Sequence, residues 1–351
     1  MSEANETIIQ AIRTGRHLEK DESAHLFDTL MAGQLPDDQI ERLLTALADK
    51  GETIDEIVGA AEAMRKHVTR IRCDAPDAID TCGTGGDGIS TFNVSTAAAI
   101  VAAGAGAKVA KHGNRSNTRK SGSAEVLRAL GVNIDTPPEG VTRCIREAGV
   151  GFLFAARLHP AMKHVVAIRR KIGRPTIFNL LGPLTNPAFV TRQVVGVPRM
   201  DLLETLARAL QRLGSVHALV VHGHDGLCDL TITGPSSIAE LRHGRLARKT
   251  IRPEDFGLSP APLDALRIHD PGESAAAIRA ILAGERGPRR DHTLLNASAA
   301  LTVAGAATDL HDGVHRAAES IDNGDAGRTL ERLITLTADT DGSGNSSGAG
   351  A

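Results

Sequence analysis

Short apolar runs alternate with helical segments from residue 78 onward, and this alternation constrains the fold more than any other feature. Neighbouring parallel strands need a long connection, which is usually a helix packed on the face of the sheet. The pattern therefore predicts an α/β fold with a mostly parallel central sheet flanked by helices. The expected strands are residues 107–110, 132–134, 151–155, 193–197 and 216–221, and the helices between them are residues 124–130, 139–148 and 202–213.

The carboxyl ends of such strands are where ligands of α/β proteins gather. The loops at Gly83 and Lys111, and the pair His222-Gly223, would all lie at this edge. Farther along, residues 238–250 read as a hairpin around His243-Gly244. Residues 273–283, 294–304 and 314–336 are expected to be helical.

The first seventy residues have a different pattern, which predicts four short helices and a small all-helical domain. Ile40, Leu43 and Leu47 belong to one apolar stripe at helical spacing, and Thr53 with Glu56 forms a capping box. Helices this small must pack on the rest of the chain or on a partner subunit. We expect a helical domain at 1–72, joined by a helix around 160–173, then an α/β domain at 73–340 and a disordered Gly/Ser tail at 341–351.

Composition argues against several classes of partner. The chain has 40 Lys and Arg against 42 Asp and Glu, so we expect neither nucleic-acid nor membrane binding. The 4 cysteines are scattered, which speaks against a disulfide framework or a zinc site. No long apolar run is present, and we expect a cytoplasmic protein. With 7 Phe and no Trp or Tyr, an aromatic ligand would have to contact aliphatic, His, Met and backbone surfaces.

Residues 83–88, Gly-Thr-Gly-Gly-Asp-Gly, form the strongest local signal. Glycine lets the backbone approach a ligand closely, and free amides beside a helix N-terminus suit an anion. Asn93, Ser95 and Thr96 follow as donors, although plain helix capping would also explain them. The sequence therefore predicts a phosphate cradle containing one acid, Asp87, for a ribose hydroxyl or a metal ion. Its spacing fits neither the dinucleotide fingerprint nor the Walker loop.

Several later motifs, in order, extend the signal beyond a glycine turn. They are residues 111–116 (Lys-His-Gly-Asn-Arg-Ser), 120–123 (Lys-Ser-Gly-Ser), 157–163 (Arg-Leu-His-Pro-Ala-Met-Lys) and 179–187 (Asn-Leu-Leu-Gly-Pro-Leu-Thr-Asn-Pro). Together with the glycine loop they closely resemble anthranilate phosphoribosyltransferase, across roughly residues 5 to 335.

The resemblance implies transfer of a phosphoribosyl group from 5-phosphoribosyl 1-diphosphate to anthranilate, the second step of tryptophan biosynthesis. It also implies a homodimer and use of Mg²⁺. The residues that it places on the sugar diphosphate are Gly83, Gly86, Asp87, Thr91, Asn93, Val94, Ser95, Thr96, Lys111, His112, Gly113, Asn114, Arg115, Arg119 and Ser123. His112 could instead be a structural histidine beside a glycine turn.

For anthranilate the resemblance implies Arg169, whose guanidinium can donate two parallel hydrogen bonds to a carboxylate. Arg170 and Lys171 follow it, so an ordinary basic helix surface is the competing interpretation. The other anthranilate positions are Gly83, Asn114, His159 and Met162, and the metal positions are Ser95, Asp229 and Asp225.

The chain departs from the family pattern at Cys228-Asp229, where the family usually carries Asp-Glu. A neutral thiol is a poor ligand for a hard cation, so weaker magnesium binding is expected unless Asp225 compensates. Residues 117–119 also differ from the small residues and serines that are usual there. Two alternatives remain, namely a pyrimidine nucleoside phosphorylase and a non-enzymatic relative that binds nucleic acid. The absence of a lysine-bearing glycine motif argues against the first, and the balanced charge argues against the second.

Overall fold

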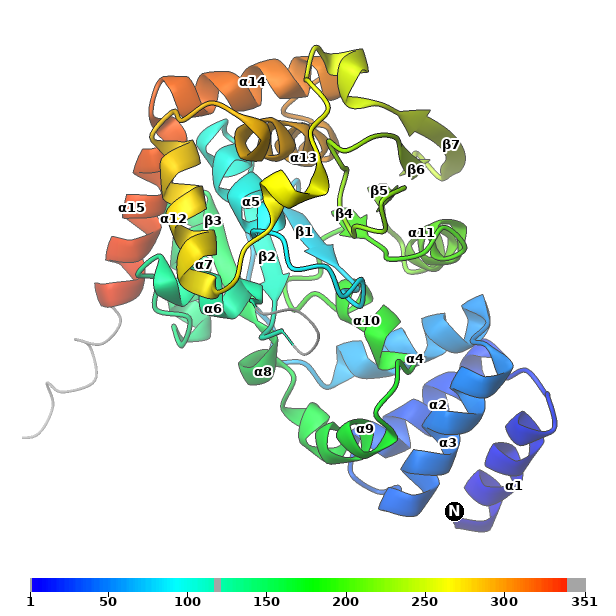
Figure 1. Ribbon diagram of the computed structural model, residues 1–351. Helices are drawn as coiled ribbons and strands as arrows, with labels where there is room; N and C mark the ends of the chain where they lie inside the picture. Colours follow the sequence, from blue (N-terminus) through cyan, green and yellow to red (C-terminus); the bar gives the residue numbers. More distant parts are fainter. Residues whose placement is uncertain (1, 117–120, 340–351) are drawn as a thin grey trace, which may run out of the picture.

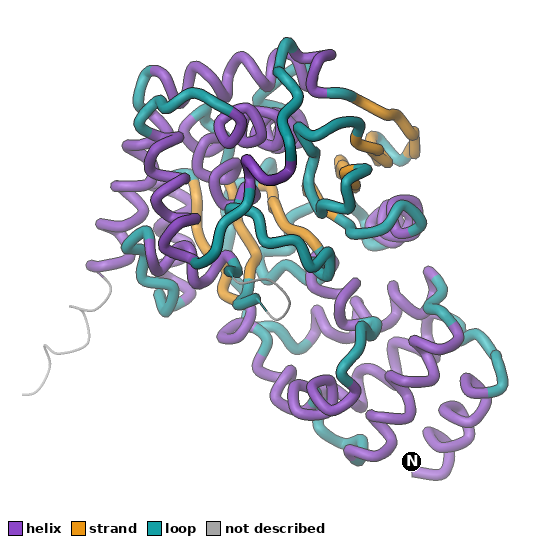
Figure 2. Tube along the Cα trace, viewed as in Figure 1, coloured by secondary structure: helices purple, strands orange, loops and turns teal. Residues whose placement is uncertain are grey.

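The computed structural model describes residues 2–116 and 121–339. Arg119 and the tail at 341–351 lie outside the described residues. Figure 1 shows an α/β region and, at lower right, a group of helices that includes the N-terminus. In Figure 2 every strand lies in the α/β region, and the lower group contains only helices and loops.

The central sheet has seven strands in the order β3-β2-β1-β4-β5-β6-β7. The five strands from β3 to β5 pair in parallel, whereas β6 and β7 pair antiparallel. The mostly parallel sheet and the hairpin are therefore confirmed. The strands are β1 (Ile79–Gly83), β2 (Val109–Gly113), β3 (Val150–Phe154), β4 (Arg192–Gly196), β5 (His217–Gly223), β6 (Ser236–Arg242) and β7 (Arg245–Ile251).

Alternation of side chains along each strand decides which helices cover which face of the sheet. On β5, Leu219 and Val221 belong to one core with helices from both halves of the chain. Ala218 and Val220 point to the other core, which continues into the N-terminal helices. The helices packed in the first core include α5 (Val94–Gly104), α6 (Ser123–Ala129), α12 (Pro271–Leu282), α13 (Pro288–Ala304), α14 (Leu310–Asp322) and α15 (Asp325–Ala338).

The N-terminal helices share a core with the opposite face of the sheet, so the helical group is anchored rather than separate. Its members are α1 (Ser2–Arg13), α2 (Lys20–Met31), α3 (Asp37–Lys50) and α4 (Ile54–Lys66), with α9 (Val166–Ile172), α10 (Phe178–Leu184) and α11 (Leu202–Arg212) in the same core. The capping box of α4 is confirmed, because Thr53 N donates to Glu56 Oε2 (2.8 Å) and Glu56 N to Thr53 Oγ1 (3.3 Å). The four helices are likewise confirmed. The expected domain boundary, between α4 and β1, stays a prediction.

Three expectations about elements were wrong. Residues 132–134 form no strand; Val132 and Ile134 are buried in the first core without joining the sheet, so burial alone explains their apolar pattern. The single helix expected around 160–173 is instead a 3₁₀ helix (Pro160–His164) followed by α9. The segment 314–336 is split between α14 and α15, because Gly324 adopts a left-handed conformation (φ 81°) that ends the first helix. The remaining helices are α7 (Pro138–Ala148), α8 (Ala155–Leu158) and the 3₁₀ helices Pro253–Phe256 and Leu263–Leu266.

Candidate active site

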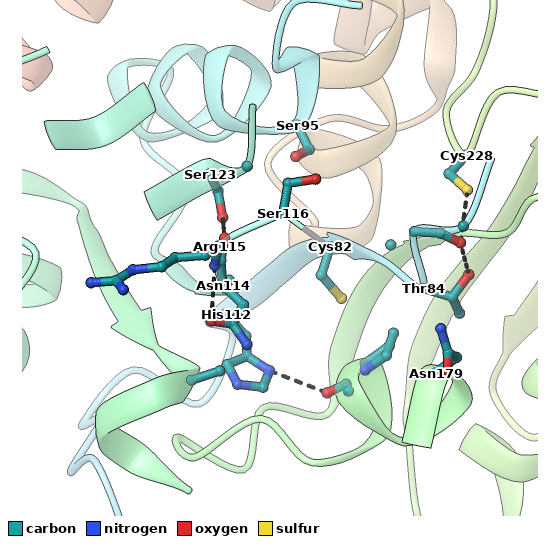
Figure 3. A pocket seen from close by; sticks show the side chains of 18 of the residues that line it. Cys82, Thr84, Ser95, His112, Asn114, Arg115, Ser116, Ser123, Asn179 and Cys228 are labelled. Carbon is teal, nitrogen blue, oxygen red and sulfur yellow. Dashed lines mark hydrogen bonds between the residues drawn. The ribbon is translucent and has the colours of Figure 1, made fainter. Parts of the chain in front are cut away.

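A cavity of about 290 Å³ opens beyond the carboxyl ends of the parallel strands, as expected for this fold. In Figure 3, Ser95, Ser116 and Ser123 lie on one side, Asn179 on the opposite side, and Cys82 between them. Twelve predicted residues line the cavity: Gly83, Gly86, Asn93, Ser95, Lys111, His112, Gly113, Asn114, Arg115, Ser123, Arg169 and Asp229.

The glycine loop follows β1 and depends on backbone conformations that side chains rarely allow. Gly85, Gly86 and Gly88 have φ of 65°, 90° and 67°. A Cβ at Gly83 would lie 3.2 Å from the carbonyl oxygen of Gly196 on the neighbouring strand. These glycines therefore allow both the turn and its close approach to β4.

Asp87 does not line this cavity, although it was expected inside the cradle. Its carboxylate accepts from the amides of Ile89 and Cys228, each at 3.3 Å. The second contact links the glycine loop to the loop that follows β5. Asp87 therefore holds the glycine loop against the loop that follows β5.

The N-terminus of α5 presents the hydroxyl and amide side chains that the sequence indicated. Asn93 caps the helix by accepting from Thr96 N (3.0 Å), and its side chain also accepts from Ser95 Oγ (3.1 Å). Lys111 Nζ donates to Ser95 Oγ (3.1 Å) and to the carbonyl oxygen of Thr81 (2.6 Å). Capping and ligand-facing positions thus coexist on one helix end.

Lys111 is buried, and burial lowers the pKa of its ammonium group. It is a fixed cation at the cavity wall rather than a mobile surface charge. Arg115 is exposed and, within the described residues, forms no ion pair; its guanidinium lies 5.7 Å from the ring centre of Phe154. The hydroxyl of Ser121, which also lines the cavity, is buried and has no partner among the described residues. The Arg115 guanidinium and the Ser121 hydroxyl are therefore available to an anion in the cavity.

Two buried histidines form a chain that begins with His112 at the cavity wall and continues to His159 behind it. His112 Nδ1 lies 3.1 Å from the carbonyl oxygen of Gly182, and the Nε2 atoms of His112 and His159 are 3.0 Å apart. Since a carbonyl only accepts, we assign the His112 proton to Nδ1 and the shared proton to His159 Nε2. Burial lowers the pKa of His112, and burial together with His112 lowers that of His159 to about 3. Both rings are therefore neutral at pH 7.

Arg169 faces the cavity from α9 without an acidic partner among the described residues. Its Nη2 donates to Asn179 Oδ1 (3.3 Å), and the guanidinium lies 5.5 Å from the ring centre of Phe178. Burial lowers its pKa. By contrast, Lys171 and Arg174 nearby are paired with Glu41 and Asp49. Arg169 thus differs from an ordinary basic helix surface, because its charge faces the cavity and no carboxylate of the described residues neutralises it.

The acidic side of the cavity contains Asp229, with Cys228 beside it. Cys228 Sγ lies 3.7 Å from the carbonyl oxygen of Gly85, so the thiol contacts the glycine loop. Asp225 does not line the cavity; its carboxylate accepts from the hydroxyls of Thr231 (2.6 Å) and Thr233 (2.8 Å). Within the described residues no group of three or more His, Cys, Asp or Glu side chains could hold a metal ion. Asp229 and the Ser95 hydroxyl nevertheless suit an ion carried mainly by substrate phosphates, since Mg²⁺ commonly uses only one or two protein carboxylates.

Comparison with known proteins identifies the family. Residues 75–327 match the α/β domain of a glycosyl transferase family, and residues 6–68 match its helical bundle domain. The chain is 52% identical over 331 residues to anthranilate phosphoribosyltransferase of Chloroflexus aggregans (94% of this chain, 97% of the relative). It is 50% identical over 337 residues to that of a Roseiflexus species (95% and 98%). The chain belongs to the anthranilate phosphoribosyltransferase family.

Solved structures of this family have the same fold. The enzyme of Thermus thermophilus superposes with a TM-score of 0.89 at 42% identity, covering 94% of this chain and 99% of the other. The Saccharomyces cerevisiae enzyme in complex with PRPP and Mg superposes with a TM-score of 0.88 at 27% identity, covering 97% and 99%. The predicted fold, enzyme class and transfer reaction are therefore confirmed, in preference to a nucleoside phosphorylase or a nucleic-acid-binding relative. Among the described residues, no helix combines the length and apolarity needed to span a membrane.

Some predicted positions lie away from the cavity wall, and the wall contains residues that were not predicted as sites. The predicted residues outside it are Asp87, Thr91, Val94, Thr96, His159, Met162 and Asp225. The added ones are Cys82, Thr84, Gly85, Ser116, Ser121, Gly122, Ala155, Phe178, Asn179, Gly182, Pro183 and Cys228. Many of them stand inside the motifs that carry the family resemblance, so motif membership was the available signal. For Ala155 and Phe178 the sequence offers no such signal, because only the fold brings them to the cavity.

Proposed function

We propose that this cavity holds 5-phosphoribosyl 1-diphosphate on the side of the glycine loop and anthranilate on the side of Arg169. The observation that carries the proposal is the meeting of a glycine loop, a capped helix end and an unpaired inward guanidinium at one cavity. The first two suit phosphate groups, and the last suits a carboxylate. Asn114 and Gly83, which line the same cavity, would contact both substrates.

The transfer reaction depends mainly on stabilising the charge that develops as the diphosphate leaves. The bond between the anomeric carbon and the diphosphate oxygen breaks, and its electron pair leaves with the diphosphate. The neutral aryl amine of anthranilate then forms the C–N bond and loses one proton, giving N-(5-phosphoribosyl)anthranilate. Because this amine is uncharged at pH 7, positioning and electrostatics can account for most of the catalysis.

The cations around the glycine loop stabilise the charge that accumulates on the leaving diphosphate. Lys111 is held there by Thr81 and Ser95, so it needs little rearrangement as charge develops. Bound Mg²⁺ would be held by Asp229 and Ser95, and would add charge neutralisation at the same phosphates. The neutral His112–His159 pair offers a rigid wall and no charged general acid near pH 7.

Two further features belong to this proposal. We infer a homodimer formed through the N-terminal helices, because these helices match the helical bundle domain of the family and the family resemblance implies a homodimer. We also infer a cytoplasmic enzyme of tryptophan biosynthesis. Gel filtration with light scattering tests the dimer, for which a monomer at micromolar concentration would be the contrary result.

The loss of anthranilate fluorescence with purified protein, 5-phosphoribosyl 1-diphosphate and Mg²⁺ tests the reaction. Arg169→Ala should raise the KM for anthranilate by about 10- to 100-fold, the value of a charge-assisted contact. The KM for the sugar diphosphate should stay within about twofold. Arg170→Ala is the matched control, since Arg170 is exposed and does not line the cavity. Equal anthranilate KM values in the two variants would refute this assignment of Arg169.

A further inference from the structure

A second cavity, of about 330 Å³, opens at the amino ends of the parallel strands, at the opposite end of the sheet from the catalytic cavity. The strands β4 and β5 begin here, the turn between β6 and β7 closes one side, and the loop after α13 closes another. Its lining is Arg192, Val216, His217, Arg242, His243, Thr302, Gly305, Ala306, Ala307, Thr308 and Arg316. β4 leads from Arg192 at this cavity to Gly196 near the catalytic one, a separation of roughly 13 Å for four residue steps.

The wall of this cavity is strongly basic. Three arginines and two histidines line it, and no Asp or Glu does so among the described residues. Two of these five groups, His217 and Arg316, are paired with carboxylates that do not line the cavity. Glu240 contacts His217 (3.1 Å) and Lys249 (2.9 Å), and Asp312 accepts from Arg316 (3.0 Å).

Two of the arginines have no acidic partner among the residues that the structure describes. Arg192 is half-buried, and its Nη1 donates to the carbonyl oxygen of Val303 at 2.8 Å. Arg242 is exposed, and its side chain forms no hydrogen bond or ion pair within the described part of the chain. Like charges gathered around one cavity repel each other, and a bound anion would offset that repulsion.

The size and lining of the cavity narrow the class of ligand. Its volume suits a small molecule, and only three of its 11 lining residues, Val216, Ala306 and Ala307, have apolar side chains. Guanidinium groups bind phosphate through two parallel hydrogen bonds. We propose that this second cavity is a binding site for a small phosphate dianion, either inorganic phosphate or a small phosphate ester. The proposal is independent of the transfer reaction, because it rests on residues outside the catalytic cavity.

Isothermal titration calorimetry at low salt tests the site, with inorganic phosphate and glycerol 3-phosphate as the two probes. Arg242→Ala should weaken binding of the phosphate probe at the second cavity at least about tenfold, the factor expected for one charge-assisted contact. Arg245→Ala is the matched control. It removes the same charge from the other side of the same turn, from a residue that does not line the cavity. Any phosphate bound at the catalytic cavity contributes equally in all three proteins and cancels in the comparison.

The outcomes separate clearly. Dependence on Arg242 for either probe supports the site, and the tighter probe tells whether free phosphate or an ester is the ligand. Identical isotherms for the parent protein, Arg242→Ala and Arg245→Ala would overturn it. The Arg242 side chain is exposed and has no partner among the described residues, so its variant should melt at the parent temperature. Arg192→Gln gives an independent second test from another strand that lines the cavity and should weaken binding in the same direction.

Discussion

The glycine loop and the Arg169 side of the catalytic cavity present donors by different means. The loop is made of backbone whose shape depends on positive φ angles at Gly85, Gly86 and Gly88. The other side uses one long side chain, which Asn179 and the ring of Phe178 hold in place. A backbone cradle costs little side-chain entropy on binding, whereas a guanidinium must be held still by neighbours. The first should therefore be sensitive to conformation and the second to local charge.

The largest expected effect concerns the glycine loop, where two alanine variants separate an effect on substrate binding and turnover from an effect on folding stability. Gly85 and Gly88 have nearly the same φ (65° and 67°), and a Cβ at either would meet no atom within 4 Å. Alanine at each should cost about 1–2 kcal/mol of stability. Gly85 lines the cavity and Gly88 does not, so Gly85→Ala, but not Gly88→Ala, should lower kcat/KM for the sugar diphosphate about 100-fold or more. Steady-state kinetics and urea unfolding of both variants check this, and equal kinetic losses would show that the loop acts only through folding.

The next prediction concerns the neutral histidines behind the Arg169 side. The pKa of His159 is lowered to about 3, so folding favours its neutral form. The unfolded chain binds more protons below pH 6.5, and stability is full above that pH and falls as the pH decreases. Between pH 7 and pH 5 His159 should account for a loss of about 2 kcal/mol. Urea unfolding of the parent, of His159→Gln and of the exposed control His315→Gln measures the difference.

His159→Gln should lose most of this pH dependence, while His315→Gln should keep it. If His159→Gln does not fold, the NMR signals of the ring protons in the parent protein give the answer directly. A His159 signal that titrates near pH 6.5 would contradict a buried neutral ring.

The sequence alone predicted the parts of this site that depend on local pattern. Helix capping at Asn93, the positive-φ glycines and the strand-to-loop edge all follow from nearby residues and strand order. The boundaries that failed were also local in origin. An apolar pair at 132 and 134 looks the same whether it is buried in a strand or beneath a turn, because periodicity cannot tell the two apart.

What the sequence could not predict depends on partners far along the chain. Asp87 turns from the cavity because its carboxylate accepts from Cys228 N, 141 residues later. Lys111 is buried and fixed because Thr81 O lies on the neighbouring strand. The unpaired state of Arg169 is likewise a property of the whole fold, since its sequence neighbours Arg170 and Lys171 are equally basic. Residue type and spacing indicate chemistry, but tertiary contacts decide which way a side chain faces.

A third prediction sharpens the role of local charge on the Arg169 side. Asn179→Asp is nearly isosteric and places a carboxylate where Oδ1 now accepts from Arg169 at 3.3 Å. The new ion pair would compete with the substrate carboxylate, so the KM for anthranilate should rise about tenfold. Asn179→Ala should have a smaller effect, because it removes an acceptor without adding charge. A larger effect for alanine than for aspartate would show that Asn179 acts through shape alone.

The smallest expected effect tests the metal side of the cavity, where Cys228 replaces an acid of the family pattern. Cys228→Asp adds a carboxylate beside Asp229, and oxygen ligands suit Mg²⁺ far better than a thiol. The Mg²⁺ concentration for half-maximal activity should fall about three- to tenfold. Direct Mg²⁺ titration by calorimetry, in the presence of the sugar diphosphate and without anthranilate, gives a readout apart from turnover. Cys228→Ser is the control and should resemble the parent, since it changes the atom without adding charge. If all three proteins bind Mg²⁺ alike, the phosphates of the substrate hold the ion with no contribution from position 228. The two sides of the cavity would then differ only in their donors, which are backbone amides on the glycine loop and the guanidinium of Arg169 on the other side.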